Sequence, residues 1–177
     1  ARIPIISHVH NFDHIGNRNI ITYITDRFLF VSENHMKNMK NIELIKKKSS
    51  VLYNAIDYKY YASGINIRKS LGLNDDDIII GSISQIAQHK GIDIICKTAQ
   101  ICCKENDKIQ FIIVGPVGNG ESDYFLEIKK EIEKNNLTDK IKFLGSRKDI
   151  PDFLASIDVF FLPTRQETFG LVIGEAL

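Results

Sequence analysis

The sequence has little cysteine, no excess of either charge and no long apolar run, and each shortage excludes a class of protein. Only three of its 177 residues are cysteine (Cys96, Cys102, Cys103), and none forms a C-x-x-C pair, which favours buried thiols in a reducing compartment. Lys and Arg number 23 against 22 Asp and Glu, so the composition gives no reason to expect a nucleic-acid partner. No apolar run approaches the ~20 residues of a membrane-spanning helix, and no signal peptide opens the chain. We therefore expect a cytoplasmic globular protein, although a peripheral membrane enzyme would have the same composition.

Short apolar runs alternate with helical stretches along the whole chain. The runs are apolar throughout, which is typical of parallel strands that are covered on both faces. The expected strands are residues 3–7, 28–32, 51–54, 77–84, 109–115, 141–145 and 159–163, and the expected helices are residues 15–25, 34–47, 91–104, 122–135 and 149–156. This alternation predicts an α/β protein with doubly wound parallel sheets.

A polar stretch between Tyr58 and Asp77 interrupts this alternation and predicts a domain boundary. We expect residues 1–60 to form part of one α/β domain and residues 61–177 to form a second. The first would open on a strand without a preceding half, and the second would end within a helix. We therefore expect the chain to be a fragment.

The end of the chain, RQETFGLVIGEAL (Arg165–Leu177), places a loop and the start of a helix after an expected strand. Backbone N–H groups of residues 168–172 would be unpaired donors at that helix N-terminus, which suits a phosphate, and Gly170 leaves the backbone approachable. Glu167 and Glu175 lie about two helical turns apart, so they would contact different parts of one extended ligand. A carboxylate is a good acceptor for sugar hydroxyls. The alternative is that Glu167 only favours the helix dipole and that Glu175 is solvated.

Two further stretches place polar side chains directly after expected strands. GSISQIAQHKG (Gly81–Gly91) brings Gln85 and Lys90 to a helix N-terminus, where a lysine can hold a diphosphate, although the P-loop pattern is absent. SHVHNF (Ser7–Phe12) contains His8 and His10, and an imidazole there suits proton transfer or a hydrogen bond to a substrate hydroxyl. We expect the two rings to point to opposite faces, which disfavours a shared metal. A surface lysine and a structural histidine are the alternatives.

In combination, these stretches resemble the group 1 family of retaining glycosyltransferases, which have the GT-B architecture of two Rossmann-like domains. ETFGLVIGE (Glu167–Glu175) matches the E-x-F-G-x-x-x-x-E pattern of that family throughout. Three other segments are similar to the family in the same order: IPIISHVH to P-x-x-x-x-x-H, VLYNAIDYKYY to N-G-V-D-x-x-x-F, and ISQIAQHKG to G-R-L-x-x-x-K-G. The first of these maps the active-site histidine of the family to His10.

The resemblance implies a nucleotide-sugar donor, with no cofactor and no metal. It implies that Glu167 holds the transferred sugar, that His10 contacts donor sugar or acceptor, and that Lys90 holds the diphosphate. The implied catalytic residues are thus Glu167 and His10. The implied donor-binding residues are Gln85, Lys90, Arg147 (whose backbone would meet the base), Thr168, Phe169, Gly170, Leu171, Val172 and Glu175 (which would bind the ribose).

The resemblance implies transfer of a sugar, with retention, from a UDP- or GDP-sugar to a glycan or lipid-linked glycan of surface polysaccharide biosynthesis. We expect a cytoplasmic enzyme, with peripheral association at the inner face of the membrane as an option, and we expect the fragment alone to be inactive. Gln85 stands where the family has an arginine, so either donor binding would be weaker or Arg147 or Arg165 would compensate for the missing charge. The second hypothesis is therefore a non-catalytic nucleotide-sugar-binding subunit on the same scaffold.

Overall fold

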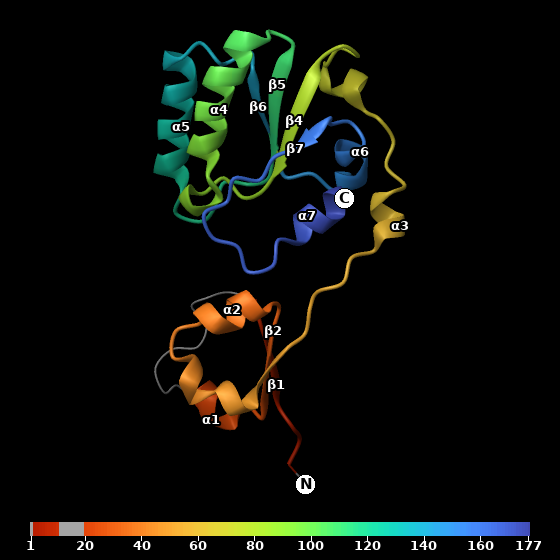
Figure 1. The fold of residues 1–177 in the computed structure, drawn as a ribbon. Helices are drawn as coiled ribbons and strands as arrows, with labels where there is room; N and C mark the ends of the chain where they lie inside the picture. Colours follow the sequence, from red (N-terminus) through yellow and green to blue (C-terminus); the bar gives the residue numbers. More distant parts are fainter. Residues whose placement is uncertain (1, 11–19) are drawn as a thin grey trace. The chain divides into compact units, whose positions relative to one another are not determined.

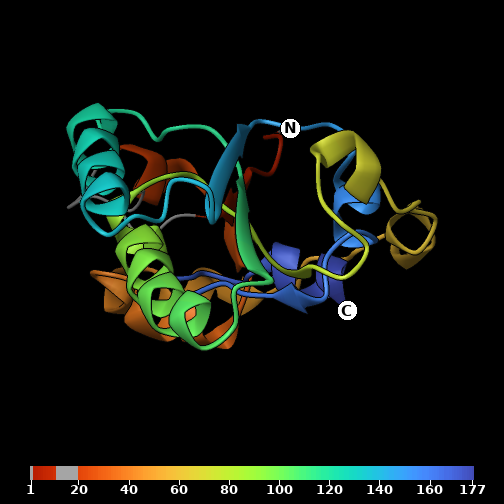
Figure 2. The same ribbon diagram turned by 90° about the horizontal axis from the view of Figure 1, so that it is seen from above.

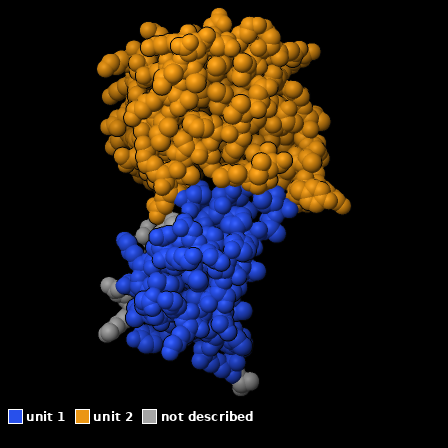
Figure 3. Space-filling view, in the orientation of Figure 1, with its two compact units in different colours: residues 1–56, 167–171 blue, residues 57–166, 172–177 orange. Residues whose placement is uncertain are grey.

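The computed structural model describes residues 2–10 and 20–177, which form two compact units (Figure 1). Figure 3 colours them separately: unit 1 comprises residues 1–56 and 167–171, and unit 2 comprises residues 57–166 and 172–177. The assignment of residues 1–60 and 61–177 to an acceptor-side and a donor-side domain stays a prediction.

Unit 1 is built on a three-stranded parallel sheet in the order β1-β2-β3. Its core consists of buried apolar side chains from the first two strands and from the segment before β3: Val9, Phe28, Phe30, Met39 and Ile45. Its elements are β1 (Ile6–Val9), α1 (Ile20–Ile24), β2 (Arg27–Phe30), α2 (Glu33–Asn38), β3 (Ser49–Val51) and the short 3-10 helices η1 (Ile42–Leu44) and η2 (Lys46–Lys48).

Several predicted bounds in unit 1 are wrong. The first strand begins three residues later than expected, because the chain pairs with β2 only from the register Ile6↔Arg27 to Val9↔Phe30. The third strand ends at Val51, where the prediction extended to Asn54. The single helix expected over residues 34–47 is broken, since Asn41 adopts a left-handed φ of 60° and starts a 3-10 turn. Residues 15–19 of the first predicted helix lie outside the described part of the chain.

Unit 2 contains a four-stranded parallel sheet in the order β6-β5-β4-β7. The strands β5 and β6 are added on one side of β4, and the chain then returns to the other side of β4 to form β7. This reversal is the switch point of a doubly wound sheet. The bounds are β4 (Ile78–Ile83), β5 (Ile109–Val114), β6 (Ile141–Gly145) and β7 (Val159–Phe160).

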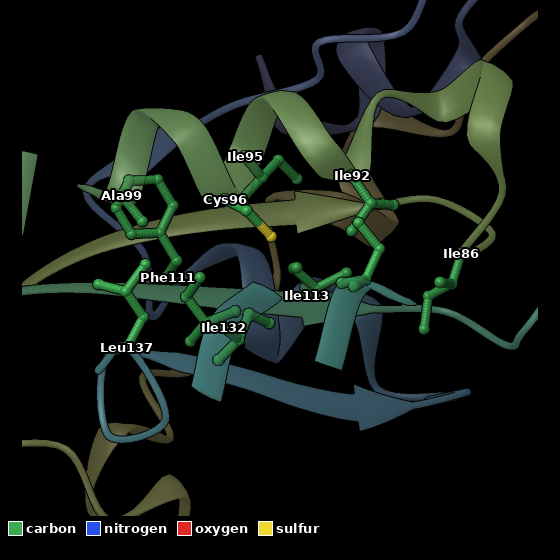
Figure 4. Packing of buried hydrophobic residues seen from close by; sticks show 11 residues of the cluster. Ile86, Ile92, Ile95, Cys96, Ala99, Phe111, Ile113, Ile132 and Leu137 are labelled. Atoms are coloured by element: carbon green, nitrogen blue, oxygen red, sulfur yellow. The ribbon is translucent and has the colours of Figure 1, made fainter. Parts of the chain in front are cut away.

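Helices cover both faces of this sheet (Figures 1 and 2). Helices α4 (Ile92–Glu105) and α5 (Ser122–Lys134) lie on one face, and α6 (Ile150–Leu154) lies on the other. Phe111 and Ile113 of β5 pack against α4 and α5 (Figure 4), whereas Ile112 and Val114 belong to the cluster that contains Phe153 of α6. The apolar runs are therefore continuous because alternate side chains enter two different cores, and the predicted α/β class is confirmed.

The polar stretch before β4 is anchored in unit 2. It contains α3 (Tyr58–Tyr61) and the 3-10 helix η3 (Arg68–Leu71). The buried guanidinium of Arg68 donates to the carbonyl oxygen of Ser156 at 2.9 Å and pairs with Asp158 at 2.6 Å. In the part of the chain that the structure describes, no helix is long and apolar enough to cross a membrane.

Candidate functional site

The switch point of unit 2 lies between two loops that follow neighbouring strands. The first follows β4, includes the 3-10 helix η4 (Gln88–Lys90) and leads into α4. The second follows β7 and leads to α7 (Leu171–Ala176). Because β4 and β7 are paired in parallel, through Ile80↔Val159 and Gly81↔Phe160, both loops leave the sheet at its carboxyl edge. Ligands of doubly wound sheets bind at such an edge.

The loop after β4 carries two of the predicted donor-binding residues. Gln85 is exposed directly after the strand, and Lys90 is half-buried at the end of η4. Between them, Ile86 is buried and donates its backbone N–H to Pro116 of the loop after β5 at 2.8 Å. Lys90 therefore stands on a backbone that is fixed to the neighbouring strand connection, just before the first turn of α4.

Arg165 of the second loop is bound to the first loop at several points. Its guanidinium donates to both carboxylate oxygens of Asp93, at 2.8 and 2.7 Å, and to the carbonyl oxygen of Gln88 at 2.8 Å. Its backbone N–H donates to the carbonyl oxygen of His89, also at 2.8 Å. The hydrogen bonds from Arg165 hold the pKa of the Asp93 carboxyl below its usual range. The sequence suggested Arg165 as a cation that could compensate for the charge missing at Gln85, but gave no indication that Asp93 is its partner.

Arg147 follows β6, at the edge of the sheet, and forms an ion pair with Asp149. Its Nε atom donates to Asp149 Oδ1 at 2.9 Å, and this contact holds the pKa of the Asp149 carboxyl below its usual range. Both arginines that could supply the charge missing at Gln85 are thus engaged with carboxylates of unit 2.

Glu175 lies in α7 and lines a cavity of about 370 Å³ together with Tyr58, Tyr61 and Leu154 of α6. Burial, together with a hydrogen bond from the Tyr61 hydroxyl to the Glu175 carboxylate, raises the pKa of Tyr61 to about 12. The phenol therefore stays protonated at neutral pH and acts as the donor. Tyr61 stands at the phenylalanine position of the N-G-V-D-x-x-x-F pattern, so this chain has a hydroxyl group where the pattern has none.

The predicted residues Glu167, Thr168, Phe169, Gly170 and Leu171 belong to unit 1. The backbone N–H of Thr168 donates to Glu167 Oε1 at 3.0 Å, so the carboxylate takes up one of the donors that we expected to be unpaired. Gly170 has a φ of 76°, a conformation that favours glycine. Val172, which was predicted with this group, belongs to unit 2 together with Glu175.

Two residues that sequence reasoning missed hold this segment. The hydroxyl of Ser32 donates to the Thr168 carbonyl oxygen at 2.7 Å and also accepts the backbone N–H of His35, which makes it the N-cap of α2. The ring of Tyr53 lies 6.3 Å from that of Phe169, centroid to centroid. Only the capping role of Ser32, directly before an acidic first turn, has a signal in the sequence.

His10 is exposed just after β1, with the ring of His8 beside it. The two ring centroids are 4.2 Å apart, so the expectation that they point to opposite faces is wrong. In extended chain, residues two apart share a face. Within residues 2–10 and 20–177, no group of three or more His, Cys, Asp or Glu side chains could hold a metal ion.

The acidic run Asp75–Asp77 has the spacing of an Asp-x-Asp pair, and the carboxylates of Asp76 and Asp77 have protein partners. Asp76 pairs with Lys108 at 2.6 Å, and the Asp77 carboxylate accepts the backbone N–H of Asn74 at 2.9 Å. The expectation that the donor site uses no metal and no cofactor stays a prediction.

Comparison with known proteins identifies the family of this chain. The model of the family described as Glycosyl transferases group 1 matches residues 64–177, so the chain belongs to this family. The O-antigen biosynthesis glycosyltransferase WclY of Escherichia coli is 30% identical over 131 residues, which cover 73% of this chain and 35% of WclY. The UDP-Gal:alpha-D-GlcNAc-diphosphoundecaprenol alpha-1,3-galactosyltransferase of Escherichia coli is 30% identical, over 78% of this chain and 36% of the relative. The chain thus spans about a third of the length of these curated relatives.

Among solved structures, HepE of Anabaena in complex with UDP and glucose superimposes with a TM-score of 0.86 and 25% sequence identity. The match covers 98% of this chain and 50% of HepE. The structural neighbours are GT-B glycosyltransferases, which confirms the fold expected from the sequence.

Proposed function

We propose that the protein carrying this chain transfers a sugar from a nucleotide-sugar donor to a glycan or lipid-linked glycan, with retention of configuration. The observation that carries this proposal is the pair of loops at the switch point of unit 2, one bearing Lys90 and the other leading into the E-x-F-G-x-x-x-x-E segment. Membership of the group 1 family supports the reaction class. HepE, named above in complex with UDP and glucose, and the galactosyltransferase, named for a UDP-Gal donor and a diphosphoundecaprenol acceptor, support the substrate classes.

In this proposal the protein supplies charge and hydrogen bonds at fixed positions. Lys90 neutralises the diphosphate, on which negative charge grows as the bond to the sugar breaks. Glu175 accepts hydrogen bonds from the ribose, Glu167 holds the transferred sugar near its anomeric carbon, and His10 contacts the donor sugar or the acceptor. Main-chain N–H groups of residues 169–172 bind the diphosphate, and the backbone around Arg147 meets the base. A lipid-linked acceptor would bring the protein to a membrane surface.

The donor site is tested by calorimetric titration of the chain with UDP, GDP and ADP. We expect one nucleotide to bind selectively and Lys90→Ala and Glu175→Ala each to weaken it at least about tenfold. The exposed α5 residues Lys130 and Glu133 give matched controls, Lys130→Ala and Glu133→Ala, which should bind like the unaltered chain. Equal affinity in all variants would remove Lys90 and Glu175 from the site.

The reaction is tested in a protein that contains the whole of this chain and that transfers a sugar from a nucleotide-sugar in an activity assay. Glu167→Gln should abolish transfer while nucleotide binding is kept, and the anomeric configuration of the product, read by NMR, should equal that of the donor. An inverted product would overturn the retaining assignment.

The second candidate is a non-catalytic subunit that binds a nucleotide-sugar. It is favoured by exposed Gln85 and by the ion pairs that engage Arg147 and Arg165. Such a subunit would bind the nucleotide and respond to Lys90→Ala, but Glu167→Gln would leave the biological output unchanged. The Glu167→Gln variant therefore separates the two candidates.

A further inference from the structure

The ion pair of Arg165 with Asp93 joins two loops that are 72 residues apart in the sequence. The guanidinium meets the carboxylate through two parallel N–H···O bonds, a geometry that fixes direction as well as distance. The third bond from the same guanidinium, to Gln88, and the backbone bond to His89 end on the turn that carries Lys90. The hydroxyl of Thr164 adds a bond to the His89 carbonyl oxygen at 3.3 Å.

Asp93 is itself held in place on the helix side. Its backbone N–H donates to the Tyr124 hydroxyl of α5 at 3.2 Å, and Lys97 lies 3.6 Å from its carboxylate, one turn further along α4. The side chain of Asp93 is only 20% exposed, whereas that of Arg165 is 44% exposed. Asp93 is therefore the fixed partner, and the pair holds the loop after β7 to the first turn of α4.

The position of this pair distinguishes it from an ordinary surface ion pair, which contributes little to stability. Lys90 precedes Asp93 by three residues, and Glu167 follows Arg165 by two. The pair thus stands between the two stretches of chain that the proposed function requires, at the switch point where doubly wound sheets bind their ligands.

We propose that Arg165 and Asp93 are positioning residues for the nucleoside diphosphate, which hold the β7 loop against the Lys90 turn before the ligand arrives. Ordering a loop upon binding costs free energy, and a site in which the loop is already fixed avoids that cost. This inference rests on the proposed function. It also gives Arg165 a role other than contact with the diphosphate, because its guanidinium is already occupied by Asp93 and Gln88.

The test uses the nucleotide that the unaltered chain binds. Arg165→Gln and Asp93→Asn should each weaken the affinity for this nucleotide about tenfold. Arg165→Lys keeps the charge but cannot form the two parallel hydrogen bonds to Asp93, so it should cause a smaller loss of affinity. If the pair acts as a unit, the double variant should bind no more weakly than either single variant. Matched controls are Asp123→Asn, in the first turn of α5, and Lys130→Gln, on its exposed face.

Hydrogen exchange gives a readout that does not depend on the ligand. The amide of Arg165, bonded to His89, should exchange at least about tenfold faster in Asp93→Asn, while amides of β5 keep their protection. Unchanged exchange and unchanged affinity would overturn the inference. If the unaltered chain binds no nucleotide, the proposed function fails. If it binds, and either the Arg165→Gln and Asp93→Asn variants bind as tightly as the unaltered chain or their losses of affinity add up in the double variant, only the positioning role fails.

Discussion

The backbone of Gly91 lies directly against the carbonyl group of Pro163. A Cβ atom on residue 91 would stand 2.1 Å from the Pro163 oxygen, far inside contact distance. Gly91 also has a φ of 74°, which L side chains rarely adopt. The close approach of the Lys90 turn to the loop after β7 therefore depends on glycine at this position for two separate reasons.

Gly91→Ala should lower the free energy of unfolding of unit 2 by about 3 kcal/mol or more. About 1 kcal/mol arises from the left-handed backbone conformation, and the remainder from the clash with a carbonyl group of the backbone, which cannot rotate away. The measurement is urea unfolding followed by circular dichroism. Because the two loops would be pushed apart, nucleotide affinity should fall as well.

Gly120→Ala is the control for this substitution. Gly120 has nearly the same φ, 75°, but a Cβ atom there would meet nothing within 4 Å. Gly120→Ala should therefore lower the free energy of unfolding only through the left-handed backbone conformation, by about 1 kcal/mol. If Gly91→Ala and Gly120→Ala lowered the free energy of unfolding equally, the close contact with Pro163 would contribute nothing to the cost of Gly91→Ala.

Arg68→Ala should destabilise unit 2 by about 3 kcal/mol, because it removes the partner of Asp158 and leaves the carbonyl groups of Ser156, Asp75 and Asp77 without this donor. Lys69→Ala, at the exposed neighbouring position, should change stability by less than about 0.5 kcal/mol. Denaturant midpoints of both variants measure the difference. A loss below about 1 kcal/mol for Arg68→Ala would show that water replaces its bonds.

Most elements of unit 2 could be predicted because their apolar side chains all face one sheet, although the strand expected over residues 159–163 is only Val159–Phe160. The helix expected over residues 91–104 is α4, Ile92–Glu105, since its apolar stripe faces one sheet throughout. The elements of unit 1 are shorter and their bounds depend on pairing. Ile3 and Ile5 are as apolar as Val9, yet only the chain from Ile6 onward lies in register with β2. Composition contains no signal for that register.

The candidate site was only partly predictable for the same kind of reason. Lys90 and Glu175 are recognisable because each stands in a local motif. The partners that fix such residues come from distant parts of the chain: Asp93 for Arg165, Tyr124 for Asp93, and Tyr61 for Glu175. No spacing rule connects them, because their proximity results from the order of the strands.

Glu175→Gln should lower the pKa of Tyr61 from about 12 without returning it to the ordinary value near 10. Burial is the larger cause of the raised pKa and remains in the variant, whereas the hydrogen bond to the carboxylate is weakened. The measurement is an NMR titration of protein with labelled tyrosine rings, assigned with Tyr61→Phe. An unchanged pKa in Glu175→Gln would exclude the Tyr61–Glu175 hydrogen bond in solution.

Cys96 should resist alkylation in the folded protein. Its side chain is fully buried between α4 and the sheet (Figure 4), and this burial raises the pKa of the thiol to about 12. Because the thiolate is the reactive form, iodoacetamide at about pH 8 should modify the half-buried Cys102 and Cys103 first and reach Cys96 only after unfolding. Mass spectrometry of the digested protein identifies the modified cysteines.

The same raised pKa makes stability depend on alkaline pH. The unfolded thiol releases its proton near its ordinary pKa of 9.0, whereas the folded thiol keeps it up to about 12. The contribution of Cys96 is therefore complete below about pH 9 and is lost as the pH rises through 12. In Cys96→Ala the free energy of unfolding should start lower, because packing is lost, but should fall less steeply over this range. Parallel slopes would contradict the assignment, because Tyr61 and Tyr124, whose pKa values are also raised to about 12, are present in both proteins.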